Sequence, residues 1–155
     1  MSENIKKSEI RVNVKDAIEL ITEIFKSKSC SDYEAKTVAE RLCGANLKGH
    51  DSHGIVRVPR YVEWMGEGKV FANKKPELVI DAGALACLDA KQGFGQVAGE
   101  HAVDEGILRA KKYGVSVVGL RNSGHLGRIG DWAERAADAG FVSFHFVNVR
   151  GSLLV

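Results

Sequence analysis

Two short polar stretches hold the residues whose side chains could carry out chemistry. The first, KGHDSHGIVRVPRY, runs from Lys48 to Tyr61, and the second, NSGHLG, runs from Asn122 to Gly127. Both contain few apolar side chains, so packing in a core does not explain their composition. Each sets histidine among small residues, and the first adds serine and arginine, which together can supply a base, a hydroxyl group and a carboxylate clamp.

These residue types suit the chemistry of a small 2-hydroxy acid. A histidine with a pKa near 6.5 can take a proton from an alcohol and return it at neutral pH. Arg57 presents a planar fork that matches a carboxylate, and Ser52 can donate to a carbonyl or hydroxyl oxygen. Because no side chain can accept a hydride, oxidation of such a substrate also requires a cofactor.

Three stretches resemble the family of NAD(P)-dependent malate/L-lactate dehydrogenases. They are GHDSHGIVRVPRYVEWMGEGKV at 49–70, GFGQVAG at 93–99 and NSGHLGRIGDWAERAADAG at 122–140. The resemblance covers roughly residues 10 to 155, and it implies a fold distinct from the Rossmann type. Members of that family are considerably longer chains, so we expect this one to be a fragment, inactive alone, of an enzyme acting on CH–OH groups.

The resemblance also implies roles for individual residues. They are catalytic His125 and His53, substrate-binding Ser52 and Arg57, and cofactor-binding Asn148 and Gly127. It implies NAD or NADP as the cofactor, a 2-hydroxy or 2-keto acid as the substrate, and a homodimer for the full-length protein. If both polar stretches serve one reaction, the ring of His125 should lie within about 10 Å of the first stretch.

Structural interpretations of the two histidine clusters remain open. Ser52 and His53 could form a capping turn, in which the serine satisfies helix amides. His125 could be a loop residue packed beside Trp132. The sequence therefore leaves a second functional class, a catalytically silent α/β module whose polar clusters bind a carboxylate ligand or a partner chain.

Arginine and histidine in the first stretch also admit simpler explanations. Arg57 could form a surface ion pair with Asp51 or Glu63, a contact that contributes little to stability. His50, Asp51 and His53 could be metal ligands, but no further strong ligand lies at a recognised spacing. We therefore predict no metal site.

The glycines of GFGQVAG do not form a dinucleotide fingerprint. They read GxGxxxG, which is longer than the Rossmann pattern, and no acidic residue ends a strand at the usual distance. We interpret them as allowing a helix start to pack closely on the sheet. His101 and His145 lie in apolar-patterned elements and are predicted to be packing residues.

Bulk composition narrows the class of protein. The chain has 155 residues and a net charge of +2 with both signs interspersed, which argues against nucleic acid as the main partner. The start is polar, and no apolar run reaches the roughly 18 residues of a membrane span. Three cysteines without a CxxC pair fit a reducing compartment, so a cytoplasmic protein without membrane contact is expected.

Apolar periodicity predicts an all-helical region at 1–70 followed by an α/β region at 71–155 with a mixed sheet, incomplete at its C-terminal end. Helices are expected at about 14–28, 32–49, 59–65, 94–113 and 129–139, and strands at about 78–80, 85–88, 115–120 and 141–149. The last strand is apolar on both faces, and such strands are normally covered on both sides. We therefore expect exposed apolar surface around it.

Overall fold

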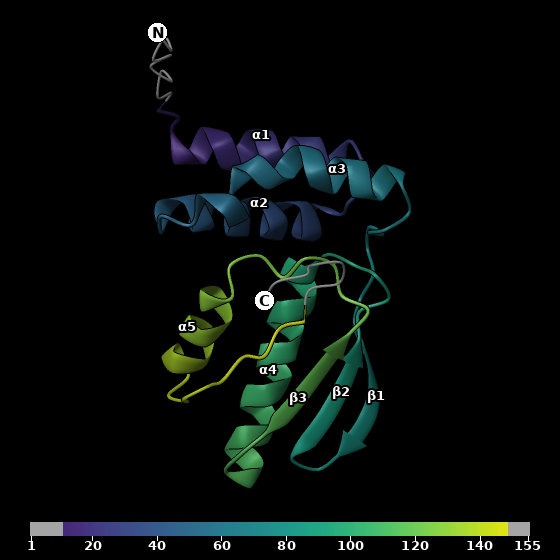
Figure 1. Cartoon of the computed structure of the whole chain (residues 1–155), viewed down its shortest axis with the longest axis vertical. Coiled ribbons are helices and arrows are strands. Elements are labelled where there is room, and N and C mark those ends of the chain that lie inside the picture. Colours follow the sequence, from purple (N-terminus) through teal and green to yellow (C-terminus); the bar gives the residue numbers. More distant parts are fainter. Residues whose placement is uncertain (1–10, 149–155) are drawn as a thin grey trace, which may run out of the picture.

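A layer of three helices lies across one end of an α/β layer (Figure 1). The computed structural model describes residues 11–148. The elements of the helical layer are α1 (Val14–Lys26), α2 (Asp32–Leu47) and α3 (Val58–Gly66). Those of the second layer are β1 (Glu77–Ala82), β2 (Leu85–Asp89), α4 (Gly95–Tyr113), β3 (Val117–Arg121) and α5 (Gly130–Asp138). The predicted fold class, helices followed by an α/β region, is confirmed.

Local signals in the sequence account for the ends of several helices. The side chain of Asn13 accepts a hydrogen bond from the backbone of Lys15, and Ser31 does the same for Glu34. Each satisfies one of the amide groups that a helix start leaves without a partner. Gly114 ends α4 with φ +82°, a conformation that glycine adopts without steric cost.

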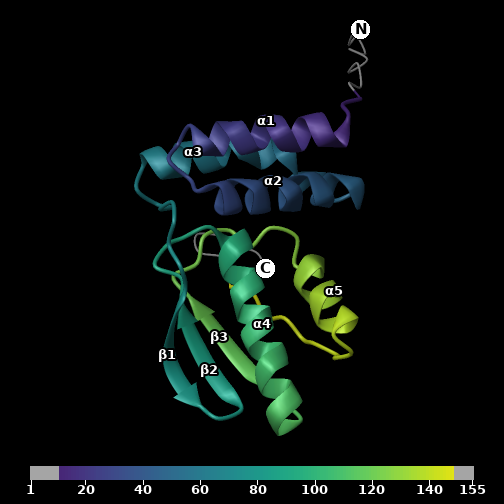
Figure 2. The same ribbon diagram turned by 180° about the vertical axis from the view of Figure 1, so that it is seen from behind.

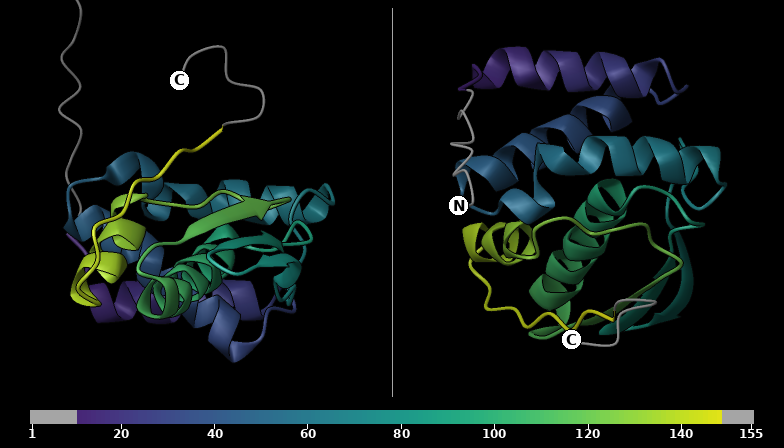
Figure 3. Two further views of the ribbon diagram at one scale, coloured as in Figure 1. Left: turned by 90° about the horizontal axis from the view of Figure 1, so that it is seen from below. Right: turned by 45° about the horizontal axis from the view of Figure 1, so that its top comes forward.

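The sheet has the order β1-β2-β3 and is mixed, with β1 antiparallel and β3 parallel to β2. The parallel pair is joined by α4, which covers one face of the sheet (Figures 2 and 3). Ala86 and Leu88 point to this face and are buried, whereas Leu85 and Val117, paired on the other face, are exposed. The side of the sheet opposite α4 is thus open to solvent among residues 11–148.

One buried apolar cluster joins the two layers. The rings of Phe25 and Phe94 meet edge to face with centroids 5.5 Å apart, and Tyr61 lies 6.0 Å from Phe94. Val38 and Leu42 of α2 are fully buried in the same cluster. The cluster fixes the start of α4 against the helices, and this junction is where the polar stretches meet. The division into two regions at residue 70 stays a prediction.

The strand predicted at 141–149 is wrong for its described part. Residues 141–148 form neither helix nor strand, and Val149 lies outside the described residues. A strand needs a hydrogen-bonding neighbour, and these residues pair with none in the described sheet. The expected exposed apolar surface is nevertheless confirmed, because Val142, Phe144 and Phe146 are 88%, 83% and 95% exposed.

The two histidines predicted to pack have different environments. His101 is half-buried on α4. His145 is exposed and its Nε2 lies 2.9 Å from the hydroxyl of Ser143, so the prediction that it is a packing residue is wrong. The reason is the missing strand, which would have set this side chain against a neighbour. No helix of the described chain is long and apolar enough to cross a membrane.

Candidate active site

The first polar stretch forms two successive 3₁₀ turns that lead from α2 into α3. The turns are η1 (Asp51–His53) and η2 (Ile55–Arg57). The Ser52 hydroxyl lies 2.9 Å from Nδ1 of His53, and Nε of Arg57 donates to the carbonyl of Ser52 at 2.6 Å. Ser52 and His53 satisfy no helix amide, so the capping interpretation does not describe them. The Ser52 side chain instead contacts His53, while Arg57 binds the backbone of Ser52.

Asn46, near the end of α2, positions both turns. Its amide nitrogen donates to the Asp51 carboxylate at 2.6 Å, and its oxygen accepts from the backbone of Ile55 at 2.8 Å. Gly54 lies against this amide, where a Cβ atom would come within 2.0 Å of the Asn46 oxygen. Asn46 was not predicted from the sequence, because nothing local marks it as the partner of the turns.

The second stretch is a loop after β3 that closes on the start of α4. Asn122 takes φ +50° and donates to the Asp89 carboxylate at 2.9 Å, while Gly124 donates to the carbonyl of Gly93 at 2.9 Å. A Cβ atom on Gly95 would lie 2.2 Å from the carbonyl oxygen of His125. Gly95 therefore admits this loop, and Gly99 admits the Trp132 ring, which a Cβ atom would approach to 2.6 Å. The prediction that these glycines pack on the sheet is corrected.

The two stretches meet at their histidines. The rings of His53 and His125 are stacked, with centroids 5.2 Å apart and planes inclined by 27°. The ring of His50 is also close, with its centroid 5.0 Å from that of His53. The predicted approach of the two clusters is confirmed, and it occurs within one chain. Trp132, which the sequence suggested as a packing partner of His125, donates to the carbonyl of Leu126 at 3.2 Å.

His125 is held by contacts that the sequence did not predict. Its Nδ1 lies 2.8 Å from the hydroxyl of Tyr61 and accepts from the amide of Gly127 at 3.2 Å. Gln96 in turn donates to the Tyr61 hydroxyl at 2.7 Å. Tyr61 lies one helical turn after Arg57, and this spacing could have indicated from the sequence that Tyr61 belongs to the site. Gln96 comes from a different element, and nothing in the sequence indicates its role.

Burial and positive charge keep both central histidines neutral at pH 7. Burial, and after it the charges of Arg57 and of a protonated His53, together lower the pKa of His125 to about 4. The pKa of His53 is also lowered, first by burial and then by His50 and Arg57. Burial raises the pKa of Tyr61 to about 12, so its phenol stays protonated. The site thus has two uncharged imidazoles beside a permanent cation.

The guanidinium of Arg57 forms no ion pair within residues 11–148. Asp51 receives its hydrogen bond from Asn46, and Glu63 pairs with Arg60 at 2.7 Å. The surface ion pair considered for Arg57 is therefore absent from the described structure. Its charge, bonded only to a backbone carbonyl, is uncompensated beside the histidines.

Gly127 and Asn148, the residues assigned to a cofactor, lie in different settings. Gly127 is buried with φ +72°, its amide faces His125, and a Cβ atom there would lie 3.3 Å from the Gln96 amide nitrogen. It positions the histidine and has no amide left for a nucleotide. Asn148 is exposed at the end of the described segment. Protein atoms occupy the space beside Gly93, Gly95 and Gly99, so the glycines of GFGQVAG leave no room there for a phosphate group.

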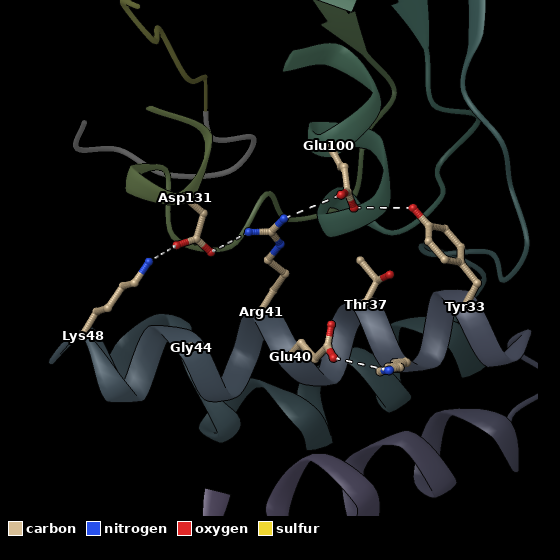
Figure 4. A pocket seen from close by; sticks show the side chains of 9 residues that line it. Tyr33, Thr37, Glu40, Arg41, Gly44, Lys48, Glu100 and Asp131 are labelled. Atoms are coloured by element: carbon tan, nitrogen blue, oxygen red, sulfur yellow. Dashed lines mark hydrogen bonds and ion pairs between the residues drawn. The ribbon is translucent and has the colours of Figure 1, made fainter. Parts of the chain in front are cut away.

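A charged cavity of about 490 Å³ lies between α2 and the start of α4 and α5, and no described histidine lines it (Figure 4). It is lined by Tyr33, Lys36, Thr37, Glu40, Arg41, Gly44, Lys48, Glu100 and Asp131. Its charges are paired, because Arg41 lies 3.8 Å from Glu100 and 3.9 Å from Asp131. The cavity therefore favours neither an anionic nor a cationic ligand. Among the described residues, no cluster of histidine, cysteine and carboxylate side chains could hold a metal ion.

Comparisons with known proteins agree with the resemblance. The model of the malate/L-lactate dehydrogenase family matches residues 12–155. Hydroxycarboxylate dehydrogenase B of Escherichia coli K12 is 47% identical over 135 residues, which cover 87% of this chain and 37% of that protein. L-sulfolactate dehydrogenase of Methanocaldococcus jannaschii is 34% identical over 136 residues, covering 86% and 39%.

Solved structures of similar proteins share the fold. Malate dehydrogenase from Pyrococcus horikoshii OT3 superposes with a TM-score of 0.82 at 32% identity, covering 90% of this chain and 40% of that one. Sulfolactate dehydrogenase from Methanocaldococcus jannaschii gives 0.80 at 32% identity, covering 83% and 38%. The chain thus spans about two fifths of the length of these relatives. By the extent of the match and the shared fold, it belongs to the malate/L-lactate dehydrogenase family.

Proposed function

We propose that the protein carrying this chain is an oxidoreductase that interconverts small 2-hydroxy and 2-keto acids, with NAD or NADP as the hydride carrier. The observation that supports it best is the uncompensated guanidinium of Arg57 beside the stacked rings of His53 and His125. A cation next to a neutral acid/base group suits a substrate that has a carboxylate beside its reacting oxygen. The malate, lactate-type and sulfolactate activities named for the relatives are of this kind.

Each side chain then has a distinct task. Arg57 binds the substrate carboxylate through its fork, and Ser52 donates to the substrate oxygen. His125 exchanges the proton of the hydroxyl group, and His53 fixes the plane of its ring by stacking. When the carboxylate binds, it offsets the charge of Arg57 and thereby makes His125 easier to protonate.

The nicotinamide would supply the hydride exchange that no side chain can perform. In this proposal the described residues form the substrate side of the site, and the GFGQVAG glycines leave no room for the phosphates of a nucleotide. Asn148 remains the proposed contact to the cofactor, while Gly127 is better explained as a support for His125. The remaining cofactor contacts, the homodimer and a cytoplasmic location are part of the same proposal for the whole protein.

The test is NADH or NADPH consumption by the protein carrying this chain, with a panel of 2-keto acids. Replacing His125 by Ala should lower turnover about 10²- to 10⁴-fold, the usual contribution of a positioned acid/base. Arg57→Lys should instead raise KM with a smaller effect on kcat, because the charge stays and the fork is lost.

His101→Ala is the matched control, because His101 is half-buried on α4 and makes none of the contacts of the site. It should keep near-normal turnover. Equal turnover by the His125→Ala variant and the unmodified protein would show that the acid/base is elsewhere.

A carboxylate-binding module without catalysis is the second candidate. The observation that favours it is that Arg57 has a charge without an ionic partner in the described structure, while the space beside the GFGQVAG glycines is occupied by protein atoms. It predicts binding of 2-keto acids to this chain without any nicotinamide turnover by the protein that carries it.

A further inference from the structure

A buried chain of hydrogen bonds runs from Gln96 through Tyr61 to His125. Gln96 lies in the first turn of α4 with 0% of its surface exposed, and Tyr61 is 2% exposed. The amide nitrogen of Gln96 donates to the Tyr61 oxygen at 2.7 Å, and that oxygen lies 2.8 Å from Nδ1 of His125. The amide oxygen of Gln96 is buried with no hydrogen-bond partner in the described structure. Buried polar atoms usually have a partner, so this one requires an explanation.

The direction of each hydrogen bond follows from the chemistry of the groups. The backbone amide of Gly127 can only donate, so Nδ1 of His125 must present a lone pair. The Gln96 amide nitrogen also only donates, so the Tyr61 oxygen accepts from it and the phenol proton is free to point to Nδ1. A neutral imidazole has one N–H group. With Nδ1 as the acceptor, that group must be at Nε2.

We propose that Gln96 acts through Tyr61 as a positioning residue that keeps the proton of neutral His125 on Nε2, so that the resting site offers a hydrogen-bond donor to the carbonyl oxygen of a 2-keto acid. This choice of substrate form rests on the proposed function, whereas the position of the proton does not. A hydroxyl group would need a lone pair at Nε2 to give up its proton, which this tautomer lacks. The resting site is therefore set for binding the keto acid.

The amide oxygen of Gln96 provides the second arrangement that the reverse direction needs. With the ring proton on Nδ1, His125 would donate to the Tyr61 oxygen, and the phenol would need an acceptor for its own proton. Turning the Gln96 amide by half a rotation places its oxygen where its nitrogen now lies. Either orientation leaves one end of the Gln96 amide without a partner, but a proton on Nδ1 would also deprive the Gly127 amide of its acceptor, so the present arrangement is favoured by one hydrogen bond. The orientation of the Gln96 amide and the position of the His125 ring proton therefore change together.

The test is ¹⁵N NMR of the imidazole nitrogens in the 155-residue chain at pH 7, where the protonated and unprotonated nitrogens have well-separated shifts. In the unmodified chain we expect the Nε2–H form of His125 to exceed the Nδ1–H form by roughly tenfold, which corresponds to about 1.4 kcal/mol. In Gln96→Glu, a carboxylate accepts the phenol proton, and the Nδ1–H form should become the major one. Gln96→Met, which removes the donor without adding charge, should bring the two forms to within roughly threefold.

Gln92→Glu is the matched control, since Gln92 is exposed and its side chain makes no hydrogen bond to described residues. It should leave the tautomer of His125 unchanged. A major Nδ1–H form in the unmodified chain would overturn the proposal. So would an unchanged tautomer in Gln96→Met, which decides the matter if the glutamate variant does not fold. Absence of dehydrogenase activity would overturn the proposed function and the choice of substrate form, but not the assignment of the proton.

Discussion

Removing the charge of Arg57 should raise the pKa of His125. Burial is the largest cause of its fall from 6.5 to about 4, Arg57 is the next and His53 the last. The charge of Arg57 therefore accounts for less than half of that fall. In Arg57→Met we expect the pKa of His125 to rise but to stay below roughly 5, because the burial remains. The measurement is a pH titration of the His125 ring signals by NMR.

Two further variants separate charge from structure. Arg57→Lys keeps the cation but loses the guanidinium bond to the carbonyl of Ser52, so the pKa of His125 should stay near 4. Arg60→Met removes a nearby arginine in the first turn of α3 that pairs with Glu63, and it should not change the pKa of His125. If the lysine variant raises the pKa as much as the methionine variant, the shift comes from a rearranged turn and not from charge.

Three stability predictions follow from the described contacts, each measured by urea unfolding. The pKa of His125 is lower in the folded than in the unfolded chain, so the free energy of unfolding should fall as the pH drops from about 6.5 to about 4. The expected loss is on the order of 1–2 kcal/mol after allowing for partial exposure, and it should be smaller in His125→Gln. Gly95→Ala, which sets a Cβ 2.2 Å from a backbone oxygen, should destabilise by roughly 1–3 kcal/mol, whereas Gly44→Ala, with nothing within 4 Å, should stabilise by roughly 0.4–1 kcal/mol. Leu42→Ala should cost about 2–5 kcal/mol, and Leu108→Ala, 64% exposed, less than about 0.5 kcal/mol. Equal effects within either pair would contradict the burial and contacts described here.

Elements that depend on local signals were predictable from the sequence. The caps at Asn13, Ser31 and Gly114 satisfy backbone groups of their own helices, so the residue type alone reports them. The strands β2 and β3 were predictable because their apolar runs are short and bounded by turns. Residues 141–148 have the same kind of pattern, yet a strand also depends on a neighbour to pair with, which a pattern does not contain.

The candidate site was predictable in its chemistry and only partly in its geometry. Histidine and arginine among small residues indicated His53, His125 and Arg57, and two of their rings are stacked. The supports of the site, Gln96 and Asn46, are amides whose roles come from tertiary contacts across tens of residues. Nothing in their neighbours along the chain distinguishes them from other polar residues.

The most direct test of the site is the titration of His125 in the presence of oxamate, an unreactive analogue of a 2-keto acid. If Arg57 binds the carboxylate beside His125, oxamate should shift the ring signals of His53 and His125 and raise the pKa of His125, because the bound charge offsets the guanidinium. Acetamide, which lacks the carboxylate, should have no effect, and Arg57→Met should lose the response. Unchanged histidine signals at saturating oxamate, or the same response in Arg57→Met, would contradict a 2-keto acid site at Arg57 and His125.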